Sequence, residues 1–140
     1  MNNLRLVLDT NVFLVSLAPH FRLHWIFQYL IQGKYDLCVT TEILNEYQEI
    51  VSQRYGLEKT DSTLDFLLLL PNVHQINPHF KWRLLKDEDD NKFIDCAVSG
   101  NANYIITNDR GFRILKTIDF PPMNILTADE FESQFKDQLD

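Results

Sequence analysis

Five short apolar runs, separated by segments with helical periodicity, constrain most strongly what this chain can fold into. The runs span residues 4–8, 37–39, 73–76, 104–107 and 124–126. Strands that alternate with helices form βαβ units with right-handed crossovers, so the strands lie parallel in one sheet. The first run is almost continuously apolar, which is typical of a strand buried on both faces. The sequence therefore predicts a three-layer α/β/α sandwich around a parallel sheet of about five strands, as in Rossmann-like folds.

The segments between these runs have the apolar spacing of amphipathic helices. Helices are expected at 12–32, divided in two by Pro19, and then at 41–56, 61–70, 90–99 and from residue 127 onward. Thr127 and Glu130 have the spacing of a capping box at the start of the last helix. The chain contains no linker, repeat or low-complexity segment, so residues 1–140 are expected to form one domain.

Length and charge narrow the class of protein further. A chain of 140 residues can fold without disulfides, so Cys38 and Cys96 are expected to be buried free thiols in a reducing compartment. The sequence has no signal-peptide pattern and no apolar stretch of about 18 residues, which predicts a cytoplasmic protein without membrane contact. A net charge of −7 excludes broad adhesion to nucleic acid, but it leaves room for a local site that contains divalent cations.

Two aspartates follow predicted strands. Asp9 comes directly after the first strand, and Asp109 lies two residues after the fourth. Parallel α/β sheets bind ligands at the carboxyl ends of their strands, near the point where the strand order reverses. Both side chains are therefore expected at this edge of the sheet, although each one alone is equally compatible with a turn or a helix N-cap.

A third carboxylate, Glu46, lies on the helix predicted to start at residue 41. Glu46 flanks the apolar face of this helix, whereas Glu42 and Glu49 lie on the opposite, solvated side. A glutamate at such a boundary can reach over the edge of the sheet. The alternative is that Glu46 is solvated as well.

The acidic run at residues 87–90 precedes another predicted helix. Acidic side chains before a helix complement its dipole and cap its free N–H groups, which explains most of the run. Asp90 aligns with the apolar stripe of that helix and so faces the sheet, whereas Asp95 falls on the solvated side. A carboxylate that faces the core needs a cation or a network of donors, which makes Asp90 a candidate site residue.

Asp9, Glu46, Asp90 and Asp109 come from four segments and are expected to converge on one edge of the sheet. Four carboxylates at close range repel one another, so they require either protons or hard cations among them. Oxygen ligands without supporting His or Cys favour Mg²⁺ or Mn²⁺ over zinc. Two such ions can activate a water molecule and stabilise the leaving oxygen of a phosphodiester, which predicts a nuclease site.

Four short stretches occur in a fixed order, and their order and spacing extend over nearly the whole chain. They are Leu8-Asp9-Thr10-Asn11-Val12, the helix that bears Glu46, Asp87 to Ala97, and Ile106-Thr107-Asn108-Asp109. In this order the sequence resembles the PIN-domain family, and in particular its small prokaryotic members that act as toxins of toxin–antitoxin pairs. By the seven-residue step to Ala97, Asp90 corresponds to the third acidic residue of the family, with Asp89 as the alternative.

The resemblance implies a PIN-like fold and a metal-dependent endoribonuclease that cleaves RNA with Mg²⁺ or Mn²⁺. The residues implied as catalytic and metal-binding are Asp9, Glu46, Asp90 and Asp109, with polar support from Asn11 and from Thr107 or Asn108. The resemblance further implies an antitoxin protein that covers the acidic cleft, and a homodimer or higher oligomer.

Basic residues gather around the third and fourth acids and are candidates for contacts to backbone phosphates. They are Lys81, Arg83, Lys86, Lys92, Arg110, Arg113 and Lys116, with Lys92 and Arg110 as the leading candidates. Phe80 and Trp82, in the loop before Asp90, can stack on an unpaired base. The alternatives are solvated charges and aromatic anchors that pack onto the domain.

Other functions are compatible with parts of the sequence. A non-catalytic PIN-like interaction module would keep its biological effect after alanine substitution at Asp9 or Asp90, whereas a nuclease would lose it. A haloacid-dehalogenase-like phosphatase also begins with a strand that ends in aspartate, but Asn11 stands where that mechanism needs a second aspartate. A phosphoacceptor receiver domain would need an aspartate after the third strand, where this chain has Asn77.

Overall fold

The computed structural model describes residues 3–140 of the chain. Within these residues the elements are, in order, β1 (Arg5–Leu8), α1 (Thr10–Ser16), α2 (His24–Ile31), β2 (Asp36–Val39), α3 (Thr41–Tyr55), α4 (Leu57–Leu69), β3 (Val73–Gln75), the 3₁₀ helix η1 (Glu88–Asp90), α5 (Asn91–Ser99), β4 (Tyr104–Ile106), the 3₁₀ helix η2 (Arg110–Thr117), β5 (Ile125–Leu126) and α6 (Ala128–Leu139). Strands alternate with helices along the chain, as the apolar pattern predicts.

The five strands form one parallel sheet in the order β3-β2-β1-β4-β5, which confirms the predicted architecture. β1 is central, and its Leu6 pairs with Leu37 of β2 and with Tyr104 of β4. Val7 and Leu8 are buried, because helices cover both faces of the sheet. The strand order reverses between β1 and β4. The carboxyl ends of these two strands therefore flank the place where parallel α/β sheets bind their ligands.

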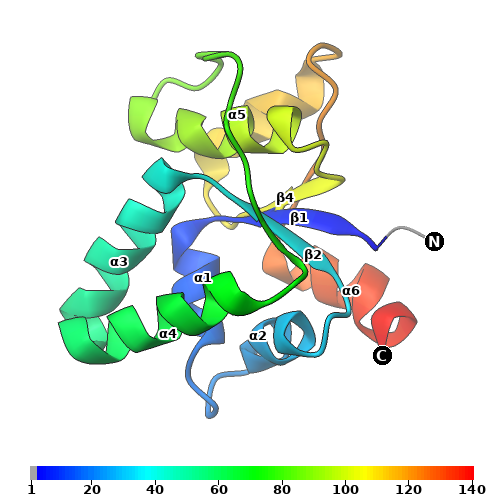
Figure 1. Cartoon of the computed structure of the whole chain (residues 1–140). Coiled ribbons are helices and arrows are strands. Elements are labelled where there is room, and N and C mark those ends of the chain that lie inside the picture. Colours follow the sequence, from blue (N-terminus) through cyan, green and yellow to red (C-terminus); the bar gives the residue numbers. More distant parts are fainter. Residues whose placement is uncertain (1–2) are drawn as a thin grey trace.

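Figure 1 shows the layers on either side of the sheet. α5 covers one face, whereas α1, α2 and α6 cover the other, and the pair α3 and α4 lies beside α1. Trp25 of α2 stacks on Phe131 of α6 with 5.1 Å between ring centroids. Phe13 of α1 stacks on Tyr47 of α3 at 4.2 Å. These aromatic contacts join the helices of the second layer to one another, and the three-layer sandwich is confirmed.

Several local predictions can be compared with the structure. The capping box of Thr127 and Glu130 is present, and Cys38 and Cys96 are buried free thiols as expected. α4 begins four residues earlier than predicted, because Gly56, at φ 86°, lets the chain turn directly from α3 into α4. Among the helices of residues 3–140, none is long and apolar enough to span a membrane.

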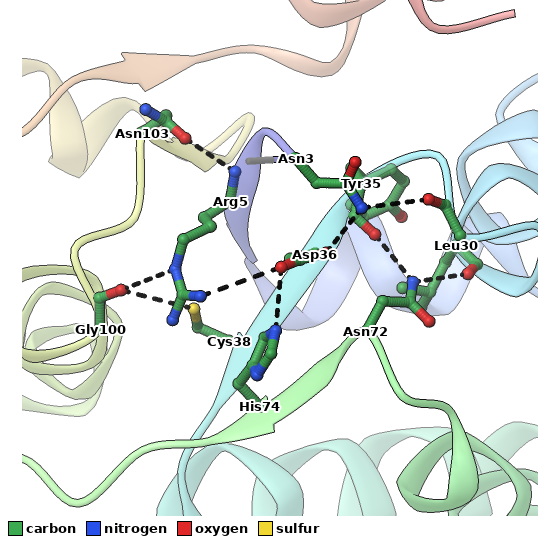
Figure 2. Close-up of polar contacts among 11 residues, drawn as sticks. Asn3, Arg5, Leu30, Tyr35, Asp36, Cys38, Asn72, His74, Gly100 and Asn103 are labelled. Atoms are coloured by element: carbon green, nitrogen blue, oxygen red, sulfur yellow. Dashed lines mark hydrogen bonds and ion pairs between the residues drawn. The ribbon is translucent and has the colours of Figure 1, made fainter. Parts of the chain in front are cut away.

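A polar network lies at the amino-terminal edge of the sheet, around Arg5 and Asp36 (Figure 2). Asp36 Oδ2 lies 2.9 Å from His74 Nε2 and 3.9 Å from Arg5 Nη1. Arg5 Nε donates to the Gly100 carbonyl oxygen at 2.9 Å. The network ties β1, β2 and β3 to the end of α5. It contains none of the predicted site residues, of which Asp9 and Asp109 follow the opposite ends of β1 and β4.

Replacing Asn72 with alanine is expected to lower the free energy of unfolding by about 2 kcal/mol. The buried Asn72 Nδ2 donates to the carbonyl oxygens of Leu30 and Tyr35 at 2.9 and 2.8 Å, and alanine removes both hydrogen bonds (Figure 2). Denaturant unfolding measures the change. The control is Asn45→Ala, at an exposed position of α3, with an expected change below about 0.5 kcal/mol. Equal stability of the Asn72 variant and the wild type would contradict this role.

Candidate active site

Two of the predicted acids lie on either side of the reversal in strand order. Asp9 directly follows β1, and its amide donates to the Ile106 carbonyl oxygen at 3.0 Å, which extends the ladder to β4. The Thr107 hydroxyl donates to Asp9 Oδ2 at 2.7 Å and accepts from the Asp109 amide at 3.0 Å. Thr107 is itself buried. It therefore links the Asp9 carboxylate to the backbone amide of Asp109 across the two strands.

The helix-cap interpretation applies to Asp109. Its Oδ1 accepts from the Gly111 amide at 2.8 Å, at the start of η2. Asp9 precedes α1, but within residues 3–140 its carboxylate makes no capping hydrogen bond to this helix. A buried carboxylate without a capping role fits the functional interpretation of Asp9 better than the structural one.

Glu46 lies on α3 and is held by two side chains rather than solvated. Its Oε2 accepts from the Thr10 hydroxyl, and its Oε1 accepts from Lys92 Nζ at 3.0 Å. Thr10 begins α1 and is buried, so its hydroxyl links α3 to the end of β1. Glu42 and Glu49 are exposed, as their positions on the helix predict.

Asp90 is the last residue of η1 and directly precedes α5. Asp87 has the ordinary capping role expected for this acidic run, because its Oδ1 accepts from the Asp89 amide at 3.0 Å. Burial, together with repulsion by Asp87 and by the other three predicted acids, raises the pKa of Asp90 to about 7. Asp89 is exposed. These surroundings favour Asp90 over Asp89 as the third acid.

The four predicted acids form one electrostatic cluster. Burial raises the pKa of Asp9, hydrogen bonding from the Thr107 hydroxyl and from the Thr10 amide lowers it, and the charges of Asp109 and Glu46 raise it further. Within residues 3–140, however, no three His, Cys, Asp or Glu side chains are arranged so that they could enclose one ion. The donor set fits a hard divalent cation by its chemistry, because it consists of carboxylate oxygens that repel one another. Binding would have to draw the carboxylates closer together.

Lys92 supplies a positive charge to one member of this cluster, Glu46. Its Nζ lies 3.0 Å from Glu46 Oε1 and 2.7 Å from the Asp89 carbonyl oxygen, and its side chain is only 13 % exposed. In this structure the ammonium group of Lys92 is paired within the protein. Its contact with a backbone phosphate stays a prediction. Thr10 and Lys92 were not predicted to hold Glu46. The position of Thr10 directly after Asp9 is the one feature of the sequence that could have indicated its contact with Glu46.

The remaining predicted site residues have different surroundings. Asn108 Oδ1 accepts from the Ala128 amide at 3.0 Å, so Asn108 anchors the start of α6. Asn11 and Arg110 are exposed, in the first turns of α1 and η2. The prediction that Asp95 is solvated is wrong. Asp95 is 8 % exposed, because the loop before η1 packs back onto α5 and covers this face of the helix.

Comparisons with known proteins agree with this architecture. A family model described as PIN domain matches residues 5–111. The chain is similar to one in the crystal structure of VapBC2 from Rickettsia felis bound to a DNA fragment from their promoter, with 19 % identity, a TM-score of 0.61, and coverage of 89 % of this chain and 98 % of that one. It is also similar to one in the structure of FitAB bound to an IR36 DNA fragment, with 14 % identity, a TM-score of 0.57, and coverage of 88 % and 94 %. At these identities the likeness shows the fold. A search of curated proteins found no match.

Proposed function

Because this chain belongs to the PIN-domain family, we propose that it is a metal-dependent endoribonuclease and the toxin of a toxin–antitoxin pair. One observation carries the proposal. Asp9 and Asp109 follow the two strands that flank the reversal in strand order, and charge repulsion among Asp9, Glu46, Asp90 and Asp109 contributes to the raised pKa values of Asp9 and Asp90. An acidic cluster at this edge is suited to RNA only when cations compensate its charge.

The proposed mechanism assigns a part to each of these side chains. The four carboxylates would hold Mg²⁺ or Mn²⁺, which supplies a Lewis acid for phosphodiester hydrolysis. Thr107 links the Asp9 carboxylate to the backbone of Asp109, and Thr10 orients Glu46. Lys92 offsets part of the negative charge and keeps Glu46 turned toward the cluster.

Purified protein is expected to cleave labelled single-stranded RNA in Mg²⁺ or Mn²⁺ and to lose this activity when a chelator removes the metal. The reason is that four uncompensated carboxylates repel the phosphate backbone. Denaturing gel electrophoresis measures the cleavage, and single-stranded DNA of the same sequence tests the preference for RNA. Undiminished cleavage in the chelator would contradict the metal site.

Two observations favour a second candidate, a non-catalytic PIN-like interaction module. In the described part of the chain, the acids are not arranged to enclose an ion, and Lys92 already pairs with Glu46. Such a module would not cleave RNA in any of these metals while remaining folded. The same assay therefore decides between the two functions.

We also propose an antitoxin partner and a homodimer or higher oligomer. The similar structures of VapBC2 and FitAB are described as bound to DNA, whereas this chain carries a net charge of −7, which disfavours a broad contact with DNA. DNA binding would therefore come from the partner. A basic side chain of the antitoxin, inserted among the acids, would block RNA cleavage by replacing the metal charge.

A further inference from the structure

Three aromatic side chains from two separate loops contact one another beside α5, and we name them the aromatic platform. Ring centroids lie 5.6 Å apart between Phe80 and Trp82, and again 5.6 Å apart between Trp82 and Phe120. Phe80 is 68 % exposed and Phe120 is 72 % exposed, with the half-buried Trp82 between them. Large exposed aromatic rings gathered at one place indicate a binding surface.

The loop that carries Phe80 and Trp82 is fixed to α5. Three backbone amides of the loop donate to three polar side chains that are spaced one helical turn apart. The donor and acceptor residues are His79 with Ser99 at 3.1 Å, Trp82 with Asp95 at 2.9 Å, and Leu85 with Asn91 at 2.9 Å. The loop therefore runs antiparallel to α5 and extends for about 12 Å from the Asp90 end of the helix. The platform is thus anchored to the same helix that Asp90 precedes.

Two basic segments carry or precede the residues of the platform: Phe80 and Trp82 lie within residues 77–86, and Phe120 follows residues 110–118 after the exposed Asp119. Residues 77–86 and 110–118 contain no Asp or Glu, although the chain has 20 of these against 13 Lys and Arg. Their exposed basic residues are Lys81, Arg83, Lys86, Arg110, Arg113 and Lys116. Exposed rings beside cations bind a polyanion with unpaired bases. In a two-fold dimer through this surface the cations would face one another, which disfavours a second copy as the occupant.

We propose that the aromatic platform stacks unpaired bases of single-stranded RNA while the neighbouring cations bind its phosphates. The inference rests on the proposed ribonuclease function, and it assigns to the RNA a contact away from the acids. Stacking on aromatic rings tolerates any base sequence. Bases in a duplex are already stacked on one another, so the platform selects single strands.

The experiment compares the double variant Phe80→Ala/Phe120→Ala with the wild type. Fluorescence anisotropy of a short labelled oligouridine, recorded in chelator so that no cleavage occurs, is expected to show a dissociation constant raised about tenfold or more. In Mg²⁺, KM for single-stranded RNA should rise while kcat stays within about twofold. Leu69→Ala is the matched control, because Leu69 is 82 % exposed on α4, and it should leave both quantities unchanged.

Two other outcomes would contradict the aromatic platform, and a third would contradict the nuclease proposal alone. If the double variant binds oligouridine as tightly as the wild type, the aromatic platform does not bind RNA. Sedimentation that shows loss of a dimer, with RNA affinity intact, also overturns it and makes this surface an interface between copies. If the wild type does not cleave RNA but the double variant binds oligouridine more weakly, the platform stands and the nuclease proposal fails.

Discussion

Asp9→Asn is expected to reduce RNA cleavage at least about 100-fold and, at the same time, to raise the thermal stability of the metal-free protein. Burial and the charges of Asp109 and Glu46 raise the pKa of the Asp9 carboxyl. Its ionisation therefore opposes folding at neutral pH. Asparagine removes the charge and can still accept from the Thr107 hydroxyl. The two effects have opposite signs because the same charge that would hold the metal destabilises the metal-free fold.

Cleavage of labelled RNA in Mg²⁺ and thermal unfolding in chelator measure the two effects. The gain in stability should disappear at low pH, because there the raised pKa leaves the wild-type carboxyl protonated as well. Asp65→Asn is the control, since Asp65 is exposed on α4, and it should change neither quantity. A variant that cleaves RNA like the wild type would remove Asp9 from the mechanism. A variant that unfolds at a lower temperature would contradict the electrostatic cluster.

Lys92→Met is expected to destabilise the metal-free protein by about 2–3 kcal/mol, because it leaves the Glu46 carboxylate without its partly buried counter-ion. The same change should increase the rise in melting temperature that Mg²⁺ causes. Removal of the ammonium group makes the cluster more negative and frees Glu46 Oε1, which lies 3.0 Å from Nζ in the wild type. Thermal unfolding with and without Mg²⁺ measures both changes.

The matched control for this variant is Lys86→Met, an exposed lysine in the loop before η1. It should shift stability by less than about 0.5 kcal/mol and leave the response to Mg²⁺ unchanged. An equal Mg²⁺ response in the Lys92 variant and the wild type would mean that Lys92 only packs against the protein. It would then have no part in compensating the acidic cluster.

The positions of Asp9 and Asp109 at one edge could be predicted from the chain alone. A run of apolar residues determines a buried parallel strand, and the residue that follows such a strand lies at its carboxyl end whatever the rest of the fold. Glu46 could be placed at a helix boundary for a similar reason, because helical periodicity is a local property. These inferences needed only neighbouring residues.

Asp95 shows where local reasoning fails. Its helical position predicts solvent, and an isolated α5 would leave it there. In the structure the preceding loop folds back, and the Trp82 amide donates to Asp95 Oδ1 at 2.9 Å. Whether an acid on the polar face of a helix is buried depends on the path of another segment. The spacing of residues within the helix does not predict that path.

The sequence by itself determined the strands, the helices and the edge at which the acids lie, because each follows from side-chain pattern over a few residues. Only the tertiary structure decided which side chains meet there. The Lys92 ammonium reaches Glu46 across 46 positions of the chain, and Phe120 reaches Trp82 from a different loop. Such contacts depend on how helices and loops pack over the sheet, since packing brings distant positions together that share no local pattern.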